Sequence, residues 1–315
     1  MFESQGDRTL AETNPSVQNV RAFWNTEACG TSFVEAEKGT AEFYEQYRAL
    51  RYAVEWHIPL LVPFSETRGR NVLEIGCGNG ADGVMFAKAG AEYTGVDLTD
   101  AAIQATRAHF DVLGLKGRFQ IENAERLSFP DESFDFVYSH GVLHHTANPL
   151  QAFSEVRRVL KPGGKAVLML YHKHSFNYYA RILIYMRLLV LLKIASRVGH
   201  FSNDRKLLDA DIKGVRGNVG DSVWQVHYEN FLRCGPSYLK AKQFVHHATD
   251  GPECPFAFVY TSGDARRIFS QFHKVDCVMA HFPLRKYSFA RWVPLSVETK
   301  IASLMGWYLF VYLTK

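Results

Sequence analysis

Three glycines stand at every second position of the stretch "VLEIGCGNGADG", residues 72–83. Gly76, Gly78 and Gly80 follow an apolar run that contains an acid, Glu74, and they precede a helical pattern. Glycine permits a tight turn and leaves room for a ligand against the backbone. Unpaired N–H groups and the positive dipole end of the following helix would also attract a polar or negatively charged part of a ligand. We therefore expect a ligand-binding loop here.

An aspartate, Asp97, ends the next apolar run, "YTGVD". A carboxylate at the tip of a second strand can accept hydrogen bonds from both hydroxyls of a ribose. Strand, glycine turn, helix, strand and terminal aspartate come in this order. The order predicts a site for a nucleoside-type cofactor at the carboxyl edge of a parallel sheet.

Two cofactors stay open at this point. Gly76-x-Gly78-x-x-Ala81 loosely satisfies the dinucleotide pattern of an NAD(P)-dependent oxidoreductase. Glu74-x-Gly76-x-Gly78-x-Gly80 favours a ligand with an ammonium and a sulfonium, because a carboxylate attracts cations and repels a diphosphate. A non-catalytic protein that has kept a nucleoside site is a third alternative.

Histidines cluster after the fourth and fifth expected strands. "SHGVLHH" supplies His140, His144 and His145, and "YHKHSFNYY" supplies Tyr171 and His172. Histidine titrates near neutral pH, so these side chains are candidates to remove a proton from an acceptor. Orienting the following loop, or seating a cap, is the structural alternative. We expect no metal site, because no acid stands at ligand spacing from His144 and His145.

Strand and helix patterns alternate from residue 71 onward and resume near the C-terminus. This alternation predicts an α/β fold, a doubly wound and mostly parallel sheet with right-handed βαβ crossovers. Strands are expected at 71–75, 93–97, 117–123, 134–140, 165–171, 274–282 and 307–314, and helices at 80–90, 99–114, 148–164 and 261–272. Thr99 is the expected N-cap of the helix 99–114.

Four stretches resemble the successive motifs of class I S-adenosylmethionine-dependent methyltransferases. They are "VLEIGCGNG", "GVD", "ENAERLSFPDESFDFVYSHGVLHH" and "EVRRVLKPGGKAVLML", and together they cover about residues 70–171. The chain is similar to the methyltransferase type 11 branch, typified by small-molecule enzymes of ubiquinone and menaquinone biosynthesis. The resemblance implies a seven-stranded Rossmann-like sheet with an antiparallel terminal strand. It also implies S-adenosyl-L-methionine as the cofactor.

The resemblance assigns roles residue by residue. The glycine loop lies under the methionine part of the cofactor, Asp97 takes the ribose hydroxyls, and Leu98 packs on the adenine. Asn123 and Ala124 replace the usual Asp-Ala pair, and an asparagine carbonyl can still accept a bond from the adenine amino group. The predicted cofactor-binding residues are Glu74, Gly76, Cys77, Gly78, Gly80, Asp97, Leu98, Asn123, Ala124, Ser139 and His140.

The variable regions surround this core. We expect an N-terminal helical lid at 1–70, a cofactor-binding core at 71–171, an inserted helical substrate cap at 172–255 and the rest of the core sheet at 256–315. Aromatic and apolar residues dominate the cap, which favours a small, hydrophobic acceptor methylated by in-line displacement. Phe23, Trp24 and Tyr44 are candidates to shield the site, and Cys29 is not expected to act as a nucleophile.

Composition limits the classes of partner and the cellular compartment that we expect. A net charge of +4 is too small to indicate nucleic acid. The five cysteines form no CxxC pair and the N-terminus has no apolar signal region, so we expect a reducing cytoplasm. Arg181, Arg187 and Lys193 interrupt the apolar segment 178–198, which we expect to be a buried or cap helix. Peripheral contact of this segment with a membrane stays open, and the sequence does not indicate an oligomeric state.

Overall fold

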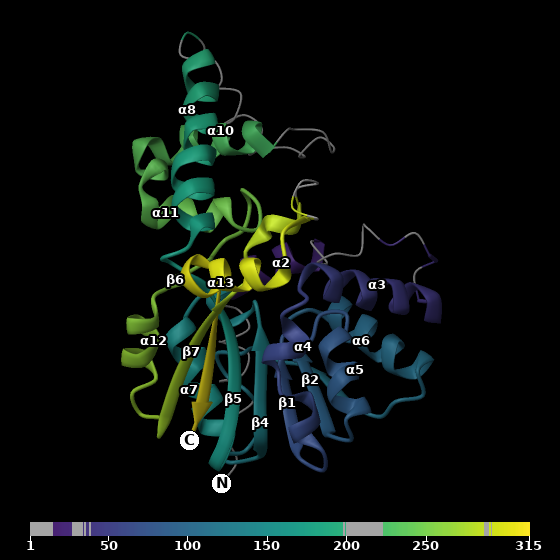
Figure 1. The fold of residues 1–315 in the computed structure, drawn as a ribbon. Helices are drawn as coiled ribbons and strands as arrows, with labels where there is room; N and C mark the ends of the chain where they lie inside the picture. The colour runs from purple at the N-terminus through teal and green to yellow at the C-terminus, as the bar shows by residue number, and fades with distance from the viewer. Residues whose placement is uncertain are drawn as a thin grey trace. The chain divides into compact units, whose positions relative to one another are not determined.

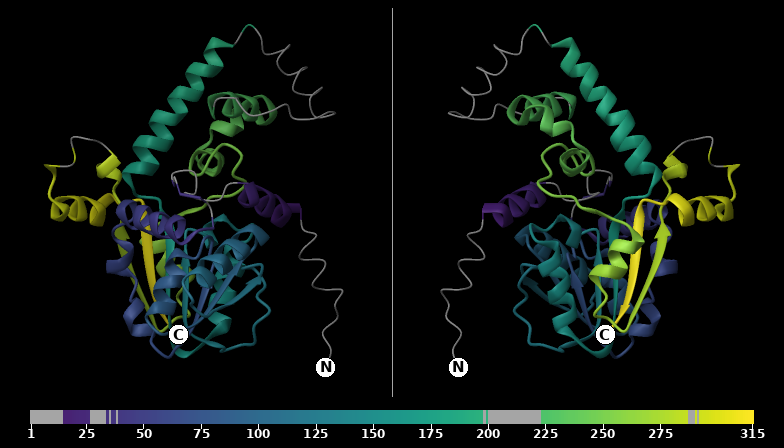
Figure 2. Two further views of the ribbon diagram at one scale, coloured as in Figure 1. Left: turned by 90° about the vertical axis from the view of Figure 1, so that its right-hand side faces the viewer. Right: turned by 90° about the vertical axis from the view of Figure 1, so that its left-hand side faces the viewer.

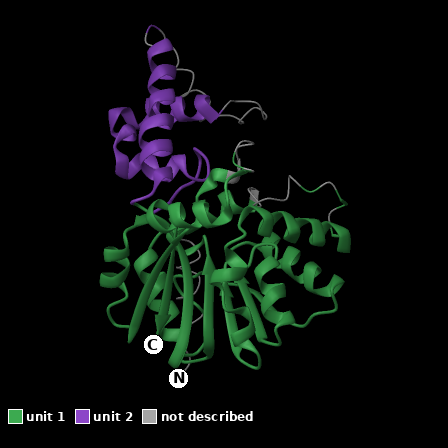
Figure 3. Ribbon diagram, viewed as in Figure 1, with its two compact units in different colours: residues 1–173, 259–315 green, residues 174–258 purple. Residues whose placement is uncertain are grey.

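The computed structural model describes residues 15–26, 34, 36–37, 39–197, 199, 223–286, 290 and 292–315. Two compact units divide the chain: a core unit of residues 1–173 and 259–315, and an inserted unit of residues 174–258 (Figure 3). Cys29 lies outside the described residues, as does residue 198, the last of the apolar segment 178–198. The division into lid, cofactor core and substrate cap stays a prediction.

An eight-stranded sheet forms the centre of the core unit, with strand order β3-β2-β1-β4-β5-β8-β7 and β6 paired with β5 outside this path (Figure 1). The strands β1 to β5 run parallel, whereas β8 is antiparallel to both β5 and β7. This confirms the doubly wound, mostly parallel α/β fold with an antiparallel terminal strand. The strands are β1 Asn71–Ile75, β2 Glu92–Asp97, β3 Arg118–Ile121, β4 Phe134–His140, β5 Leu160–His172, β6 Val259–Tyr260, β7 Lys274–Ala280 and β8 Tyr308–Thr314.

Side-chain caps fix several helices of the core unit. The Thr99 hydroxyl accepts from the first turn of α6, as the sequence predicts, and Asn148 caps α7 in the same way. Thr261 and Asp264 form a reciprocal capping box on α12. The helices of this unit are α2 Pro15–Thr26, α3 Ala41–Val54, α4 Ile58–Leu61, η2 Phe64–Thr67, α5 Ala81–Lys88, α6 Asp100–Val112, η3 Leu143–His145, α7 Pro149–Val159, α12 Ser262–Ile268, η7 Pro283–Lys286 and α13 Leu295–Met305.

Strand alternation gives the sheet two different faces. Leu73, Val137 and Leu168 belong to a buried cluster that also contains Phe153 of α7 and Phe269, directly after α12. Side chains at the intervening positions point to the opposite face, because successive residues of a strand alternate. That second face carries the polar residues of β1 and β4 that form the candidate site.

The helix predicted over 148–164 is wrong at its C-terminal end. α7 ends at Val159, and Leu160 already pairs with Phe134 as the first residue of β5. The pairing then shifts, so that Phe136 lies opposite Lys165. Pro162 cannot continue a helix, and Leu160 is fully buried in the sheet, so burial decides where the strand begins.

The inserted unit is helical (Figure 2). It contains the π-helix η4 Asn177–Met186, then α8 Arg187–Ser196, α10 Val223–Cys234, η6 Gly235–Leu239 and α11 Ala241–Ala248. Tyr228, Tyr238 and Phe244 are buried in its centre. Within the residues that the structure describes, no helix is both long enough and apolar enough to cross a bilayer.

Candidate functional site

The three glycines of the turn have different surroundings. All have positive φ, at 83°, 53° and 76° for Gly76, Gly78 and Gly80. A Cβ on Gly76 would lie 2.1 Å from Val142, and a Cβ on Gly80 would lie 2.9 Å from Thr106, whereas a Cβ on Gly78 would meet no atom within 4 Å. Gly76 and Gly80 are therefore required by packing, and Gly78 borders open space that a ligand can use.

The amides of this turn are occupied within the chain. Gly76 N and Cys77 N donate to the Val96 carbonyl at 2.7 and 3.0 Å, and Gly80 N donates to the Cys77 carbonyl at 2.8 Å. Gly78 N donates to Asp97 Oδ2 at 3.2 Å. The sequence argument invoked unpaired amides at this turn, and for these four residues that is wrong. The turn therefore offers a ligand open space but few free N–H donors. This disfavours a diphosphate, which would need such donors.

Asp97 closes the turn and keeps accepting capacity. Its Oδ1 accepts from the backbone N and the hydroxyl of Thr99, both at 2.9 Å, and its Oδ2 accepts from Gly78 N. A carboxylate offers about four lone-pair sites, so Oδ2 can accept one further hydroxyl. Burial raises the pKa of Asp97, and the bonds from Thr99 and Gly78 oppose this shift.

Glu74 is buried and faces Tyr93. Its Oε2 accepts from the Tyr93 hydroxyl at 2.5 Å, and its residue exposure is 3%. Burial and the neighbouring Asp82 raise the pKa of Glu74 well above its usual value. Gly83 lies against this pair, because a Cβ there would come within 2.4 Å of the Tyr93 hydroxyl. The predicted role of Glu74 toward a cofactor stays a prediction.

A buried ion pair, which the sequence reasoning missed, lies directly after the turn. Asp82, in the first turn of α5, accepts from Arg51 Nη2 at 2.7 Å. It also accepts from the hydroxyls of Tyr52 and Tyr138 at 2.8 and 3.0 Å. Burial disfavours the charge on Asp82, but Arg51 outweighs it and lowers the pKa of the carboxyl. The ion pair ties α3 to the helix that follows the glycine turn.

A second polar cluster lies beyond the carboxyl end of β4. The Tyr308 hydroxyl donates to Glu55 Oε1 at 2.8 Å, and Glu55 Oε2 lies 3.0 Å from Arg51 Nη1. The Tyr308 ring stacks on His281 at 4.5 Å between centroids and meets the His140 ring edge-on at 5.5 Å. Sequence reasoning found His140 alone, since the other members come from distant elements.

His281 and His57 show that this cluster is constrained. His281 has φ = 60°, a backbone conformation that is uncommon for a residue with a side chain. His57 is buried, and its ring centroid lies 5.4 Å from that of His281. Neither ring nitrogen of His57 has a hydrogen-bond partner among the described residues. Burial and the nearby His281 lower the pKa of His57 to about 3. Strained and unsatisfied groups of this kind often gather at functional sites.

The charge states of Glu55 and His140 complement each other. Burial opposes the charge on Glu55, but Arg51 and His140 lower its pKa, so it is ionised. Burial lowers the pKa of His140, and Glu55 partly counteracts that shift. His140 Nε2 is buried without a hydrogen-bond partner among the described residues. A neutral imidazole beside a carboxylate can take up a proton.

Three of the other predicted catalytic residues lie close together. His144 is buried against Tyr171, with ring centroids 4.0 Å apart, and lies 4.3 Å from His145. Burial and His145 lower the pKa of His144 well below its usual value. Trp24 of α2 meets His145 at 5.2 Å. The structure therefore brings His144, His145 and Tyr171 together.

Other predicted site residues are held by backbone groups. His172 is buried, and its Nδ1 lies 3.0 Å from the Gly306 carbonyl, while the Ser139 hydroxyl donates to the Ile75 carbonyl at 2.8 Å. The first bond joins β5 to the residue that follows α13, and the second joins β4 to β1.

The residues expected near the adenine lie at the ends of β2 and β3. Asn123 Oδ1 accepts from Glu125 N at 2.9 Å and keeps one lone pair for a ligand. Ala124 is buried in the core cluster, and Leu98 directly follows Asp97 with its side chain half-buried. Tyr44, predicted as part of a lid, stacks on His109 of α6 at 4.3 Å. The roles of these residues toward a ligand stay predictions.

Comparisons with known proteins relate residues 73–168 to the family described as "Methyltransferase domain". The ubiquinone biosynthesis O-methyltransferase of Alkalilimnicola ehrlichii is 34% identical over 125 residues, which are 39% of this chain and 51% of that protein. The protein of the same name from Maricaulis maris is 39% identical over 97 residues, 30% of this chain and 38% of that protein. The chain thus spans about half or less of the length of these curated relatives.

A solved structure supports the fold over most of the chain. It is a chain of the complex between the Haloferax volcanii Trm112 methyltransferase activator and a candidate methyltransferase. It is 14% identical to this chain, with a TM-score of 0.50, and the match covers 94% of this chain and 96% of that one. At this identity the similarity concerns the fold alone.

Proposed function

Because residues 73–168 form a methyltransferase domain of the class I S-adenosylmethionine-dependent family, we propose that this chain methylates a small, hydrophobic acceptor that carries a hydroxyl group. The hydroxyl is suggested by the O-methyltransferase names of the curated relatives. The single observation that carries the proposal is the glycine turn closed by Asp97, inside the matched region.

The residues present fit S-adenosyl-L-methionine. The open space beside Gly78 admits the ligand, Asp97 Oδ2 can accept a ribose hydroxyl, and Asn123 Oδ1 can accept from an adenine amino group. The cofactor supplies a methyl group already activated by its sulfonium. The protein therefore mainly has to align the acceptor and exclude water, and alignment can contribute about 7–11 kcal/mol.

His140 is our choice for the group that removes the acceptor proton. Its buried Nε2 has no partner among the described residues, and its lowered pKa keeps the ring neutral near pH 7. When Nε2 takes the hydroxyl proton, the ring becomes a cation, which the ionised Glu55 stabilises. Arg51 and Tyr308 hold Glu55 in place. His144, His145, Tyr171 and His172 remain further candidates.

Location and partners are part of the same proposal. We expect the enzyme to work in the reducing cytoplasm, as the scattered cysteines suggest, and to act on a free small molecule. A hydrophobic acceptor partitions into membranes, so we also expect the segment 178–198 to touch a membrane surface peripherally.

Product formation tests the proposal. The purified chain is incubated with methyl-labelled S-adenosyl-L-methionine and a panel of catechols and phenols with alkyl tails. We expect label in the organic phase that depends on both enzyme and acceptor, and much less of it with His140→Ala. Cofactor binding without label on any acceptor would favour the non-catalytic alternative. Binding of NADH in place of S-adenosyl-L-methionine would favour the oxidoreductase.

A further inference from the structure

One face of the helix formed by η4 and α8 is apolar and exposed. Ile184, Tyr185, Leu188, Leu191 and Leu192 have exposures between 47% and 66%. We call these five residues the apolar stripe. Their spacing of three or four residues places them along one side of the helix. Scattered exposed apolar side chains are ordinary, but a contiguous row of five large ones marks an interaction surface.

The opposite side of the same helix is already packed. Tyr178, Ile182, Met186, Val190 and Ile194 recur every four residues and are buried. η4 contacts α11, and α8 contacts α10, within the inserted unit. The stripe is therefore additional to the hydrophobic face that stabilises this unit. The sequence prediction of a buried or cap helix missed the stripe.

Positive charge surrounds the stripe. Arg181, Arg187, Lys193 and Arg197 are distributed along the segment, and no acidic residue occurs between positions 174 and 199. Arg187 and Lys193 fall on opposite flanks of the leucines of α8 at 100° per residue. An amphipathic helix with cations beside an apolar face is the pattern that lies in the interfacial plane of a bilayer.

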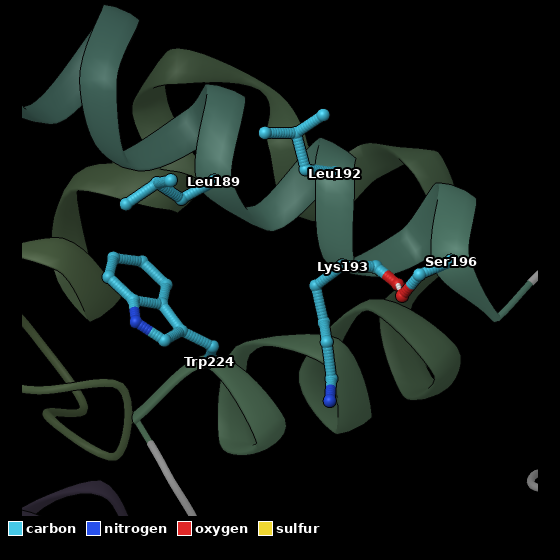
Figure 4. A pocket seen from close by; sticks show the side chains of 5 residues that line it. All are labelled: Leu189, Leu192, Lys193, Ser196 and Trp224. Carbon is cyan, nitrogen blue, oxygen red and sulfur yellow. Dashed lines mark hydrogen bonds between the residues drawn. The ribbon is translucent and has the colours of Figure 1, made fainter.

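A shallow groove adjoins the stripe. Leu189, Leu192, Lys193 and Ser196 of α8 line it together with Trp224 of α10 (Figure 4). The figure shows the Trp224 indole ring on the side of Leu189, and the Lys193 side chain extending away from α8. An apolar slot with a cation and a tryptophan suits the boundary between acyl chains and anionic headgroups, where amphipathic aromatic rings are enriched.

We propose that the apolar stripe docks this protein onto an anionic lipid bilayer. The leucines enter the boundary between headgroups and acyl chains, and Arg181, Arg187 and Lys193 contact anionic headgroups. The inference deepens the proposed function, because a hydrophobic acceptor is then collected where it accumulates. It rests on the stripe and its charges alone, and so it does not require that methyl transfer occurs.

Charge argues for a bilayer rather than a second copy of the chain. A two-fold interface sets the same surface against itself. Two stripes set face to face would bring Arg181, Arg187 and Lys193 of one copy toward the same three cations of the other, with no acidic residue of the segment to neutralise them. An anionic bilayer neutralises these three cations at once.

Flotation with vesicles tests the inference. The 315-residue chain is mixed with phosphatidylcholine vesicles or with vesicles that also contain phosphatidylglycerol. We expect flotation with the anionic vesicles, and its weakening in high salt. The double variant Leu188→Gln/Leu191→Gln should reduce binding by at least about 10-fold. Arg181→Gln/Arg187→Gln should reduce it about 25-fold, since each cation contributes a factor of about 5.

Matched substitutions control for surface hydrophobicity and charge. Leu60→Gln/Leu150→Gln removes two leucines of the core unit that are more exposed than Leu188 and Leu191. Lys240→Gln/Lys242→Gln removes two exposed lysines from the inserted unit. Both should float like the wild type, and all variants should keep their melting temperature. Equal flotation of the Leu188→Gln/Leu191→Gln variant, or no flotation of the wild type, overturns the proposal. So does a dimer that this double variant dissociates without vesicles.

Failure of the two proposals can be told apart. Turnover of a water-soluble acceptor should be unchanged in all four double variants. A wild type that floats but never methylates would contradict the proposed function and leave the docking surface standing.

Discussion

The Tyr308 hydroxyl donates a hydrogen bond of 2.8 Å to Glu55, a residue 253 positions earlier in the chain. This bond joins the terminal strand β8 to the C-terminal end of α3. It fixes a carboxylate near His140, at the carboxyl end of β4. The arrangement gives His140 a charged partner that local sequence does not indicate.

Glu55→Gln should slow methyl transfer and alter its pH dependence. Burial and Arg51 lower the pKa of His140, whereas the carboxylates of Glu55 and Asp82 raise it. Without the charge on Glu55 the pKa of His140 falls, so the acidic limb of the kcat/KM profile should move to lower pH. The plateau should drop about 10-fold, because the imidazolium is less stabilised. An acidic limb that stays in place or moves upward would show that Glu55 does not act through His140.

Gly78→Ala should remove cofactor binding while the protein stays folded. The new Cβ meets no protein atom, so it occupies only the space left for the ligand, and the positive φ costs about 1–2 kcal/mol. Gly114→Ala is the matched control, because Gly114 has φ = 62° and equally open surroundings away from the turn. Calorimetry should show loss of S-adenosylhomocysteine binding in Gly78→Ala alone. Equal affinity in both variants would rule out the space beside Gly78 as the binding site.

Arg51→Met should destabilise the core unit by about 3 kcal/mol, because it leaves the buried Asp82 carboxylate without its cation. The control is Arg107→Met, on the exposed side of α6, and urea unfolding at pH 7 measures both. The pKa of Asp82 is lowered in the folded state, so its stabilisation is present above the unfolded value near 4 and is lost as pH falls through the folded value. Arg51→Met should lose that acid sensitivity. If both variants unfold at the same urea concentration, the ion pair contributes nothing.

Glu74→Gln should reduce the loss of folding stability that occurs as pH rises above about 4. The pKa of Glu74 is raised in the folded state, so its contribution is present below about pH 4.3 and is lost as pH rises toward the folded value. Glutamine keeps the shape, has no charge and can still accept from Tyr93. The variant should therefore be at least as stable as the wild type at pH 8. A large loss of stability there, by urea unfolding, would mean that the ionised carboxylate is the stabilising form.

Local patterns predicted what lies close together in the sequence. The glycine turn, Asp97 and the cap of Thr99 all fall within 24 residues, and strand alternation with βαβ order fixed the sheet. The family resemblance is confirmed by the match over residues 73–168. These features depend on chain geometry that short motifs encode.

Long-range partners could not be predicted in the same way. Arg51 meets Asp82 across 31 positions, and Glu55 meets Tyr308 across 253, so no periodicity connects them. The apolar stripe was missed for another reason. Apolar residues occur throughout the segment 178–198, and only its packing against α10 and α11, which lie far along the chain, decides which of them are buried.

Calorimetric titration of S-adenosylhomocysteine into the wild type and into Asp97→Asn tests the central claim most directly. Asparagine keeps the size of the side chain, and its Oδ1 can still accept from the backbone N of Thr99. It lacks the charge and one of the acceptor oxygens. We predict one binding site per wild-type chain and affinity at least about 10-fold weaker in Asp97→Asn, since hydrogen bonds to a charged group contribute about 1.5–3 kcal/mol. Absence of binding to the folded wild type, or equal affinity in the two proteins, would contradict the account.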